Sequence, residues 1–194
     1  MNKIIIGITG QIGSGKTTAT NELIKQGFHE LAFATPLKDF LSDLFMLDRS
    51  KMNDQKYKNT IDLRWGKSPR ELMQLCGTNF VREMIHPDFW VMRLAAELLK
   101  SKYKKIVISD VRFSNEAQLI RQHGFLFHIK RVDNPYKKVG IKNHKSEQVL
   151  EIAYNDFIIR NIKLENFKRD VKQTADMITN RKRRINERQN CKTN

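Results

Sequence analysis

The sequence predicts a single α/β domain in which a parallel β-sheet is covered by helices on both faces. Short β-branched runs alternate along the chain with longer segments of helical periodicity, which is the order typical of parallel sheets. The first of these runs leads directly into a glycine-rich turn and a helix. The length of 194 residues and the hydrophobic share of 40% suffice for one core of ordinary size.

The first half of the chain contains two predicted strands and two predicted helices. Residues 3–9 form a buried strand, because four of the seven residues are isoleucine. A helix follows over 16–26, and 28–34 is a second strand after the glycine that ends this helix. The next helix covers 35–47, where the threonine is expected to be the cap and the proline suits the first position. The lysine-rich segment 48–67 is expected to be a mobile loop, with a short helix as the alternative.

The second half begins with two predicted helices. The helix over 69–85 has the clearest start signal, because a serine, a proline and a glutamate can form a capping box there. The helix over 87–100 also opens with proline. Strand 105–109 then ends at an aspartate, helix 114–123 is expected to be capped by its first serine, and strand 125–131 follows a glycine.

The remaining elements complete the sheet and close the fold. Residues 132–143 are polar with glycine and proline, and we expect a loop or lid there. A fifth strand covers 156–160, and a final helix runs from about 164 to beyond 179. We expect no membrane span, because no apolar run approaches about 18 residues, and the N-terminal run is a strand rather than a signal peptide.

The cysteine content and the net charge indicate the cellular compartment and the kinds of partner that this protein can have. Cys76 and Cys191 stand far apart without metal-ligand spacing, which excludes a disulfide framework and favours a reducing, cytoplasmic compartment. The net charge is +15, and residues 161–194 hold ten Lys or Arg against four Asp or Glu. A solvated helical tail explains this excess, and a contact with nucleic acid or another partner is the alternative.

The segment Gly10–Thr17 matches the phosphate-loop pattern G-x-x-x-x-G-K-[ST] between a strand and a helix. Glycines let backbone N–H groups converge on phosphate oxygens, and the helix N-terminus adds positive potential. Lys16 is expected to reach the β- and γ-phosphates of ATP, and Thr17 to bind Mg²⁺. The predicted nucleotide-binding residues of this motif are Gln11, Gly13, Ser14, Gly15, Lys16, Thr17 and Thr18.

Asp110 lies at the carboxyl end of a predicted parallel strand, the edge at which ligands bind in such sheets. We expect it to hold a water of Mg²⁺ or an acceptor group, with an exposed strand-end aspartate as the alternative. The next residues are Val111 and Arg112 rather than a second acid that would activate water. This favours phosphoryl transfer to an acceptor over hydrolysis.

A polar stripe marks the helix over 69–85. Its members, each four residues from the last, are Arg70, Gln74, Thr78 and Arg82. Gly77 costs this helix about 1 kcal/mol relative to alanine, which a closely approaching ligand or helix would explain. Arginine forks bind phosphate with two parallel hydrogen bonds. The candidates for holding phosphate are therefore Arg70, Arg82, Arg112 and Arg131, with a solvated face as the alternative.

These motifs resemble the deoxynucleoside monophosphate kinases of bacteriophages and other large DNA viruses. The resemblance spans roughly residues 4–161 and is far more specific than Gly10–Thr17 alone. Besides the phosphate loop, the similar stretches are Phe33–Asp39, Arg70–Thr78, Asp88–Val91, Ile108–Ala117 and His144–Glu147.

The resemblance implies a three-layer P-loop kinase fold of the nucleoside-monophosphate-kinase type, with a five-stranded parallel sheet. It also implies phosphorylation of a deoxynucleoside monophosphate to the diphosphate with ATP and Mg²⁺. The core would cover 1–162, with acceptor-binding helices at about 35–101 and a lid at about 132–147. Residues 163–194 would be a basic helix or tail.

Residue roles follow from the same resemblance, together with the phosphate-binding candidates. Residues acting on the transferring phosphoryl group would be Lys16, Asp110, Arg112 and Arg131, with Thr17 and Asp110 toward the metal. The acceptor would be bound by Lys38, Arg70, Gln74, Gly77, Thr78, Arg82, Trp90, Asp110, Arg112 and Glu116. Asn161 would border the adenine of ATP.

Several alternatives stay open at this point. The loop 48–67 and the tail after Asn161 match no part of the family, which leaves the base specificity and any extra binding role undecided. The chain could instead belong to another class of small-molecule kinase, and the alternatives are animal-type phosphomevalonate kinase, thymidylate kinase and dephospho-coenzyme A kinase. A nucleic-acid-binding ATPase is a further alternative, because contacts with nucleic acid would explain the net charge of +15. A homodimer is left as an alternative to a monomer.

Overall fold

A five-stranded parallel sheet forms the centre of the structure, as predicted. The computed structural model describes residues 3–132 and 149–190. The strand order is β2-β3-β1-β4-β5, and all neighbouring strands pair in parallel. The strands are β1 (Ile4–Thr9), β2 (His29–Leu31), β3 (Lys105–Ile108), β4 (Phe125–Arg131) and β5 (Phe157–Asn161).

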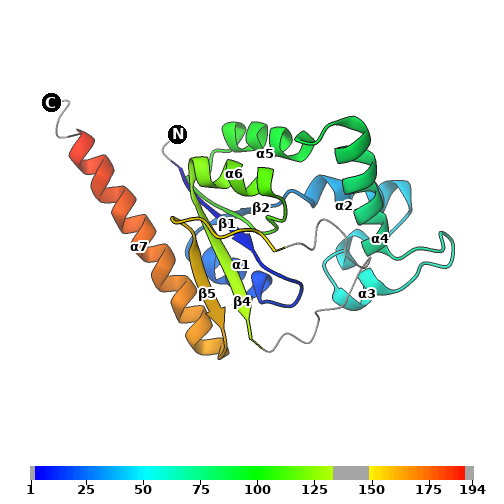
Figure 1. Cartoon of the computed structure of the whole chain (residues 1–194), viewed down its shortest axis with the longest axis horizontal. Coiled ribbons are helices and arrows are strands. Elements are labelled where there is room, and N and C mark those ends of the chain that lie inside the picture. Colours follow the sequence, from blue (N-terminus) through cyan, green and yellow to red (C-terminus); the bar gives the residue numbers. More distant parts are fainter. Residues whose placement is uncertain (1–2, 133–148, 191–194) are drawn as a thin grey trace.

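Helices cover both faces of this sheet and make three layers (Figure 1). On one face, α1 (Lys16–Lys25) and α7 (Leu164–Asn190) pack with Ile6 and Ile8 of β1. On the other face, α5 (Phe89–Lys100) and α6 (Ser114–His123) pack with Ile5. The alternation of β1 side chains between two apolar cores is the reason why its isoleucine run carries almost no polar residue.

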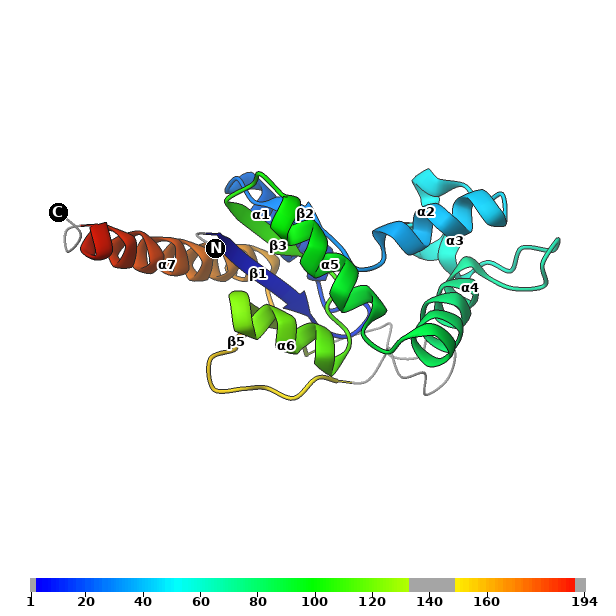
Figure 2. The same cartoon turned by 90° about the horizontal axis from the view of Figure 1, so that it is seen from above.

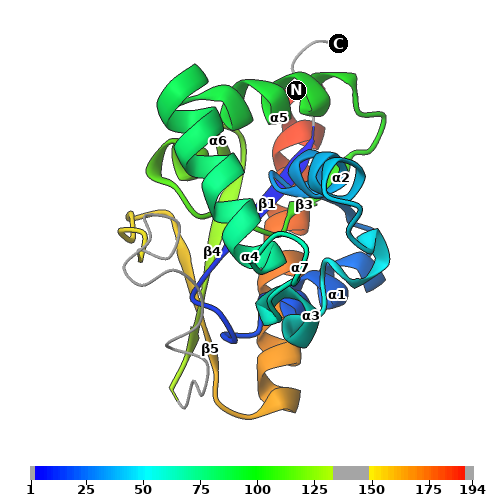
Figure 3. The same cartoon turned by 90° about the vertical axis from the view of Figure 1, so that its right-hand side faces the viewer.

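The chain between β2 and α5 builds a helical lobe. It contains α2 (Thr35–Leu44), the short 3₁₀ helix η1 (Arg49–Lys51), α3 (Gln55–Asn59) and α4 (Pro69–Gln74). A π-helix, η2 (Leu75–Ile85), continues directly from α4. Figure 2 shows that the lobe lies apart from the sheet helices, on the side toward which the arrow of β1 points. Seen from that side, α2, α3 and α4 lie in front of the strands (Figure 3).

The predicted elements are present, with differences that have local causes. The capping box at the start of α4 forms, because the Ser68 hydroxyl accepts from the amide of Glu71 and the Glu71 carboxylate accepts from that of Ser68. The segment 48–67 is more ordered than a loop, because the carboxylate of Asp48 caps η1 and that of Asp54 caps α3. β2 is shorter than 28–34.

Two predicted helix caps are wrong. Thr35 and Ser114 are the first helical residues of α2 and α6, and neither hydroxyl caps its helix. Instead, a carboxylate from a distant part of the sequence or from within the helix accepts hydrogen bonds from the backbone amides at each helix start. Asp110 accepts from the amides of Phe33 and Ala34 just before α2, and Glu116 accepts from two amides just before α6. Both carboxylates are stabilised by these helix N-termini.

The last helix runs to Asn190, in agreement with the prediction of a helix from about 164 to beyond 179. Its first half belongs to the core, because Phe167, Val171, Ala175 and Ile178 are buried with α1 and β5. The boundary predicted after residue 162 therefore does not coincide with a break in the packing. Beyond these residues α7 projects past the sheet (Figure 2).

Two further expectations concern what lies around this core. Apart from residue 132, the predicted lid 132–147 lies outside the described residues. Within the described ranges, no helix combines the length and the apolar character needed to cross a membrane.

Candidate active site

The turn between β1 and α1 has the backbone of a phosphate-binding loop. Gly10, Gly13 and Gly15 have φ values of 149°, 74° and 110°, which side chains at Cβ disfavour. The Ser14 hydroxyl is buried and has no hydrogen-bond partner in the part of the chain that the structure describes. A bound anion would supply the missing partner. The loop therefore fits the phosphate tail of a nucleotide.

A pocket opens at this loop, and we name it the phosphate-loop pocket. The Lys16 ammonium lies across the loop, where it donates to the carbonyls of Gly10 at 2.6 Å and Gln11 at 2.9 Å. Arg131, at the end of β4, donates to the carbonyl of Gly13 at 3.3 Å. The pocket is lined by Thr9, Gly10, Gln11, Ser14, Lys16, Val111, Arg112, His128, Ile129, Lys130, Arg131, Val149 and Leu150.

The other predicted nucleotide residues surround the loop without lining this pocket. Gly13 and Gly15 shape its backbone, and Thr17 and Thr18 lie on the first turn of α1, with Thr17 exposed. The Asn161 amide donates to the carbonyl of Ser14 at 2.8 Å. Asn161 thus supports the loop from behind, and its contact with adenine remains a prediction.

A second pocket lies between the lobe and the carboxyl end of β3, and we name it the helical pocket. All ten residues predicted for the acceptor line it: Lys38, Arg70, Gln74, Gly77, Thr78, Arg82, Trp90, Asp110, Arg112 and Glu116. Six further residues that the sequence analysis did not propose also line it: Phe33, Ala34, Leu37, Lys58, Met73 and Phe113. The structure thus brings the predicted set together, and its role toward a ligand remains a prediction.

Among the residues that the structure describes, only Arg112 lines both pockets. Its backbone amide donates to the Glu116 carboxylate at 2.7 Å, which fixes the main chain at the end of β3. The side chain starts from this fixed point between the two pockets. A cation in this position can contact anions on either side.

Asp110 lines the helical pocket and not the phosphate-loop pocket. Its two carboxylate oxygens accept from the amides of Phe33 at 2.8 Å and Ala34 at 2.9 Å. Each ionised oxygen keeps a further acceptor site, so a water or a ligand hydroxyl can still bind. Asp110 therefore joins the lobe to the sheet edge, and its predicted role toward a metal is not tested by this geometry.

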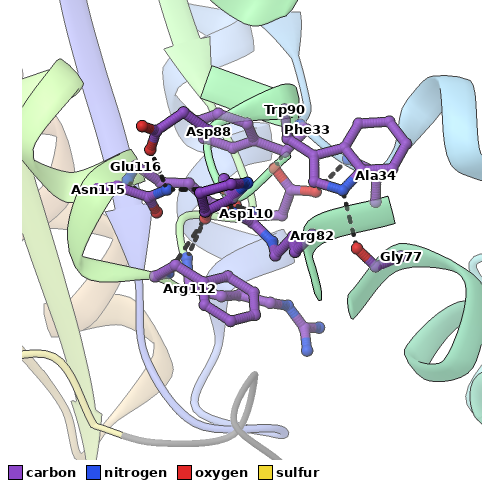
Figure 4. A network of polar contacts seen from close by, with 12 residues as sticks. Phe33, Ala34, Gly77, Arg82, Asp88, Trp90, Asp110, Arg112, Asn115 and Glu116 are labelled. Atoms are coloured by element: carbon purple, nitrogen blue, oxygen red, sulfur yellow. Dashed lines mark hydrogen bonds and ion pairs between the residues drawn. The ribbon is translucent and has the colours of Figure 1, made fainter. Parts of the chain in front are cut away.

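Arg82, predicted as a phosphate ligand, is instead paired with a buried carboxylate. Its guanidinium forms an ion pair with Glu116, donates to the carbonyl of Pro87 at 3.0 Å and lies 3.9 Å from the centre of the Phe113 ring. Burial raises the pKa of Glu116, whereas the charge of Arg82 lowers it. Figure 4 shows this network, which links η2 to the start of α6. We therefore assign Arg82 and Glu116 to the wall of the pocket.

This pair yields a stability prediction. Arg82→Met should lower the free energy of unfolding by about 3–5 kcal/mol, because it leaves a buried carboxylate without its counter-charge. Urea denaturation followed by circular dichroism measures the loss, with the exposed Arg93→Met as control. The double variant Arg82→Met/Glu116→Gln should regain part of it. A stable Arg82→Met protein with only a raised KM would instead support the original assignment to phosphate.

The π-helix explains how the polar stripe reaches one pocket. In an α-helix, residues four apart drift around the axis, so the ends of a long stripe face different directions. The wider turn of η2 reverses this drift beyond Gln74. As a result, Arg70, Gln74, Thr78 and Arg82 are all between 5% and 8% exposed and all line the helical pocket.

Gly77 and Trp90 brace the same wall. A Cβ at Gly77 would come within 2.7 Å of a methyl carbon of Leu37, so the close approach of α2 explains the glycine in mid-helix. The Trp90 indole donates to the Gly77 carbonyl at 2.9 Å (Figure 4). Trp90 is buried by this contact, and stacking on a ligand remains a prediction for its pocket-facing edge.

Lys58 and His128 each line a pocket but were not predicted from the sequence. Lys58 lies in the segment read as a loop, although Asp54 was a helix-capping signal that could have revealed α3. His128 lines the phosphate-loop pocket, and its Nε2 lies 2.9 Å from the Asp156 carboxylate. Asp156 also accepts two hydrogen bonds from Arg121. No local pattern could find this cluster, since its members are far apart in the sequence.

The described residues contain no group of three or more His, Cys, Asp or Glu side chains that could hold a metal ion. Magnesium does not require one, because it is commonly held by one or two protein oxygens together with phosphates and water. The exposed hydroxyl of Thr17 beside Lys16 fits that donor set.

Comparison with known proteins gives a consistent assignment. A family model described as deoxynucleotide monophosphate kinase matches residues 43–171. A protein of Acanthamoeba polyphaga mimivirus named for the same activity is 35% identical over 186 residues, covering 84% of this chain and 92% of the viral protein. The deoxynucleoside-5′-monophosphate kinase of Escherichia phage T5 is 35% identical over 109 residues, which cover 50% of this chain and 44% of that protein.

The structural comparison concerns the fold. The crystal structure of TT1252 from Thermus thermophilus has a TM-score of 0.51 and 17% identity, covering 91% of this chain and 98% of that one. At this identity, the likeness extends to the arrangement of strands and helices.

Proposed function

The chain belongs to the deoxynucleotide monophosphate kinase family, and from this premise we propose that it transfers the γ-phosphoryl group of ATP to a deoxynucleoside monophosphate. The products are ADP and the deoxynucleoside diphosphate. The phosphate-loop pocket is the donor pocket, and the helical pocket is the acceptor pocket. The reaction would supply nucleotide precursors in the cytoplasm of the producing or host cell.

The single observation that supports transfer most directly is the shared position of Arg112. Phosphoryl transfer needs the donor and acceptor phosphates in line, with their charge neutralised between them. Arg112 belongs to the linings of both pockets. A cation at this junction can stabilise the transferring group, which touches both substrates at once.

The other residues divide between the two substrates. Lys16 and the loop amides bind the donor phosphates, and Arg131 approaches them from β4. Asp110, with acceptor sites left on its carboxylate, is suited to a water or hydroxyl on the acceptor side. Gln74 and Thr78 offer neutral hydrogen-bonding groups, and Phe33 and Trp90 offer apolar surface for the base and sugar.

Magnesium ion would neutralise charge on the donor phosphates when it is bound. Thr17 is the residue that we propose to hold it, because its hydroxyl is exposed next to Lys16 at the start of α1. Asp110 is proposed to act toward the metal through water, since its oxygens already accept two backbone amides.

An acceptor panel tests the proposed function. Purified protein is incubated with ATP and Mg²⁺ and with each of the common deoxynucleoside and ribonucleoside monophosphates, and ADP release is measured. We expect ADP release with one or more deoxynucleoside monophosphates and a diphosphate product in equal amount. Activity on phosphomevalonate or dephospho-coenzyme A alone would contradict the proposal. ATP hydrolysis stimulated by DNA, without any acceptor activity, would also contradict it.

A further inference from the structure

Helix α3 brings a lysine to the acceptor pocket from the segment 48–67, which lies within the matched residues 43–171 but for which the sequence alone indicated no role. Lys58 lines this pocket together with Lys38, Arg70 and Arg112. Its side chain is half-buried. Across residues 3–132 and 149–190, the Lys58 ammonium forms no hydrogen bond or ion pair. A half-buried cation of this kind is suited to an anionic ligand.

The neighbouring cations are already engaged with protein groups. The Lys38 ammonium donates to the Asn53 side chain at 2.8 Å. Arg70 donates from Nε to Asn59 at 2.7 Å and from Nη2 to Gln55 at 2.9 Å. Lys58 thus differs from both neighbours in keeping its donors available.

Arg70 holds α3 by both ends. Gln55 and Asn59 are the first and last residues of this helix, and their spacing of four places them on one face toward α4. Lys58, three residues after Gln55, is directed toward the same side and into the pocket. Lys56 is exposed and does not line the pocket. The two bonds from Arg70 therefore set the position of Lys58.

The charges around Lys58 show what the pocket lacks. Burial, together with the positive charges of Arg70, Lys38 and Arg112, lowers the pKa of Lys58 to about 8, against a smaller opposite effect of Asp54. The carboxylates of the pocket, Asp110 and Glu116, are held by backbone amides and by Arg82. Negative charge is therefore in deficit beside Lys58, and a phosphate dianion would supply it.

We propose that Lys58 binds the phosphate of the acceptor nucleotide, and that Arg70 is a positioning residue that holds α3 over the pocket. This assignment rests on the proposed function and extends it to a residue that the sequence alone did not indicate. It also changes the role that the polar stripe suggested for Arg70.

The test compares Lys58→Met with Lys56→Met, a lysine on the same short helix that faces solvent. For Lys58→Met we expect KM for the deoxynucleoside monophosphate to rise about 10- to 100-fold, the usual effect of losing a hydrogen bond to a charged group. KM for ATP should stay unchanged, and kcat should change much less than KM. Lys56→Met should match the wild type, and Lys58→Arg should restore most of the lost affinity.

A ligand without phosphate separates phosphate binding from a general disturbance of the pocket. The corresponding deoxynucleoside, used as a competitive inhibitor, should bind Lys58→Met and the wild type equally well. A parallel loss of deoxynucleoside affinity would overturn the assignment to phosphate. Equal KM values for Lys58→Met and Lys56→Met, with an active wild type, would overturn the role of Lys58 alone. A wild type inactive on every deoxynucleoside monophosphate would overturn the proposed function itself.

The ionisation of Lys58 adds a pH signature. The ammonium that binds phosphate is present below a pKa of about 8 and is lost above it. Wild-type kcat/KM for the acceptor should therefore fall as pH rises from 7 to 9. Lys58→Arg should remain flat over this range, because a guanidinium keeps its proton. A fall of the same size in Lys58→Arg would point to Lys38, whose pKa burial also lowers, and would contradict the proposal.

The positioning role of Arg70 has its own readout. If Arg70 acts through Lys58, the effects of Arg70→Met and Lys58→Met on acceptor KM overlap in the double variant. KM of the double variant should then lie close to that of the weaker-binding single variant. If the increase in acceptor KM of the double variant equals the product of the two single increases, Arg70 binds the acceptor independently. This result would overturn its role as an anchor of α3.

Discussion

Replacing Arg112 with alanine is expected to lower kcat by about 10³-fold or more, the range typical of an arginine that stabilises a transferring phosphoryl group. Arg112 lines both pockets, so its loss removes positive charge from the junction between the two substrates. The substitution spares the backbone amide that donates to Glu116. The fold at the end of β3 should therefore persist, and the loss should appear in the chemical step. Single-turnover formation of the diphosphate measures it.

The position of Arg112 also predicts which KM values change. Because the residue lines both pockets, Arg112→Ala should raise KM for ATP and KM for the acceptor together. Arg93→Ala provides the control, because Arg93 is an exposed arginine of α5 paired with Glu97 on the same helix. An Arg112→Ala enzyme that keeps its kcat would remove the main support for in-line transfer between the two pockets.

Lys16→Ala is the second variant with a large expected effect. Its kcat should fall about 10²- to 10³-fold, the range for removing one donor aimed at developing charge in a transition state. In the present structure the Lys16 ammonium is held across the loop by two carbonyls of Gly10 and Gln11. The ammonium therefore already lies beside the loop, in the pocket where the donor phosphates are proposed to bind.

Lys25→Ala tests whether this effect is specific. Lys25 is an exposed residue at the other end of α1, where it forms an ion pair with Glu22, and it lines neither pocket. We expect Lys16→Ala and Lys25→Ala to unfold at nearly the same temperature in circular dichroism, while only the first loses activity. Unlike Arg112→Ala, Lys16→Ala should leave KM for the acceptor unchanged. A Lys16→Ala protein with near wild-type turnover would disprove the assigned role of the loop.

Much of the active-site region could be predicted from local patterns. The phosphate loop needs glycine at positions of positive φ and a lysine at the helix start, and these are requirements of the backbone within a few residues. The polar stripe and the strand-end residues, together with the resemblance to a kinase family, indicated the ten pocket residues, which lie on four separate stretches of the chain. The common edge at which parallel strands end explains the position of Asp110 and Arg112, whereas most of the other residues reach the pocket from helices of the lobe.

The ionic partners of these residues could not be predicted in the same way. Arg70 and Arg82 are both arginines of the same helical stripe. Arg82 nevertheless pairs with Glu116, whereas Arg70 donates to two side chains of α3. The local sequence around an arginine does not indicate which side chain will accept its hydrogen bonds. The acceptors of Arg70 and Arg82 on α3 and at Glu116 lie 11 to 34 residues away along the chain.

The sequence by itself determined the parallel α/β sheet, the phosphate loop and ten residues that line the helical pocket, because hydrophobic periodicity, backbone requirements and motifs act over short distances. Only the tertiary structure decided which partners those residues contact. The π-helix turned the stripe into one pocket, Glu116 neutralised Arg82, and Arg70 anchored α3 with Lys58 above the pocket. These outcomes depend on contacts between distant segments, in which burial and charge pairing are settled only when the whole chain is packed.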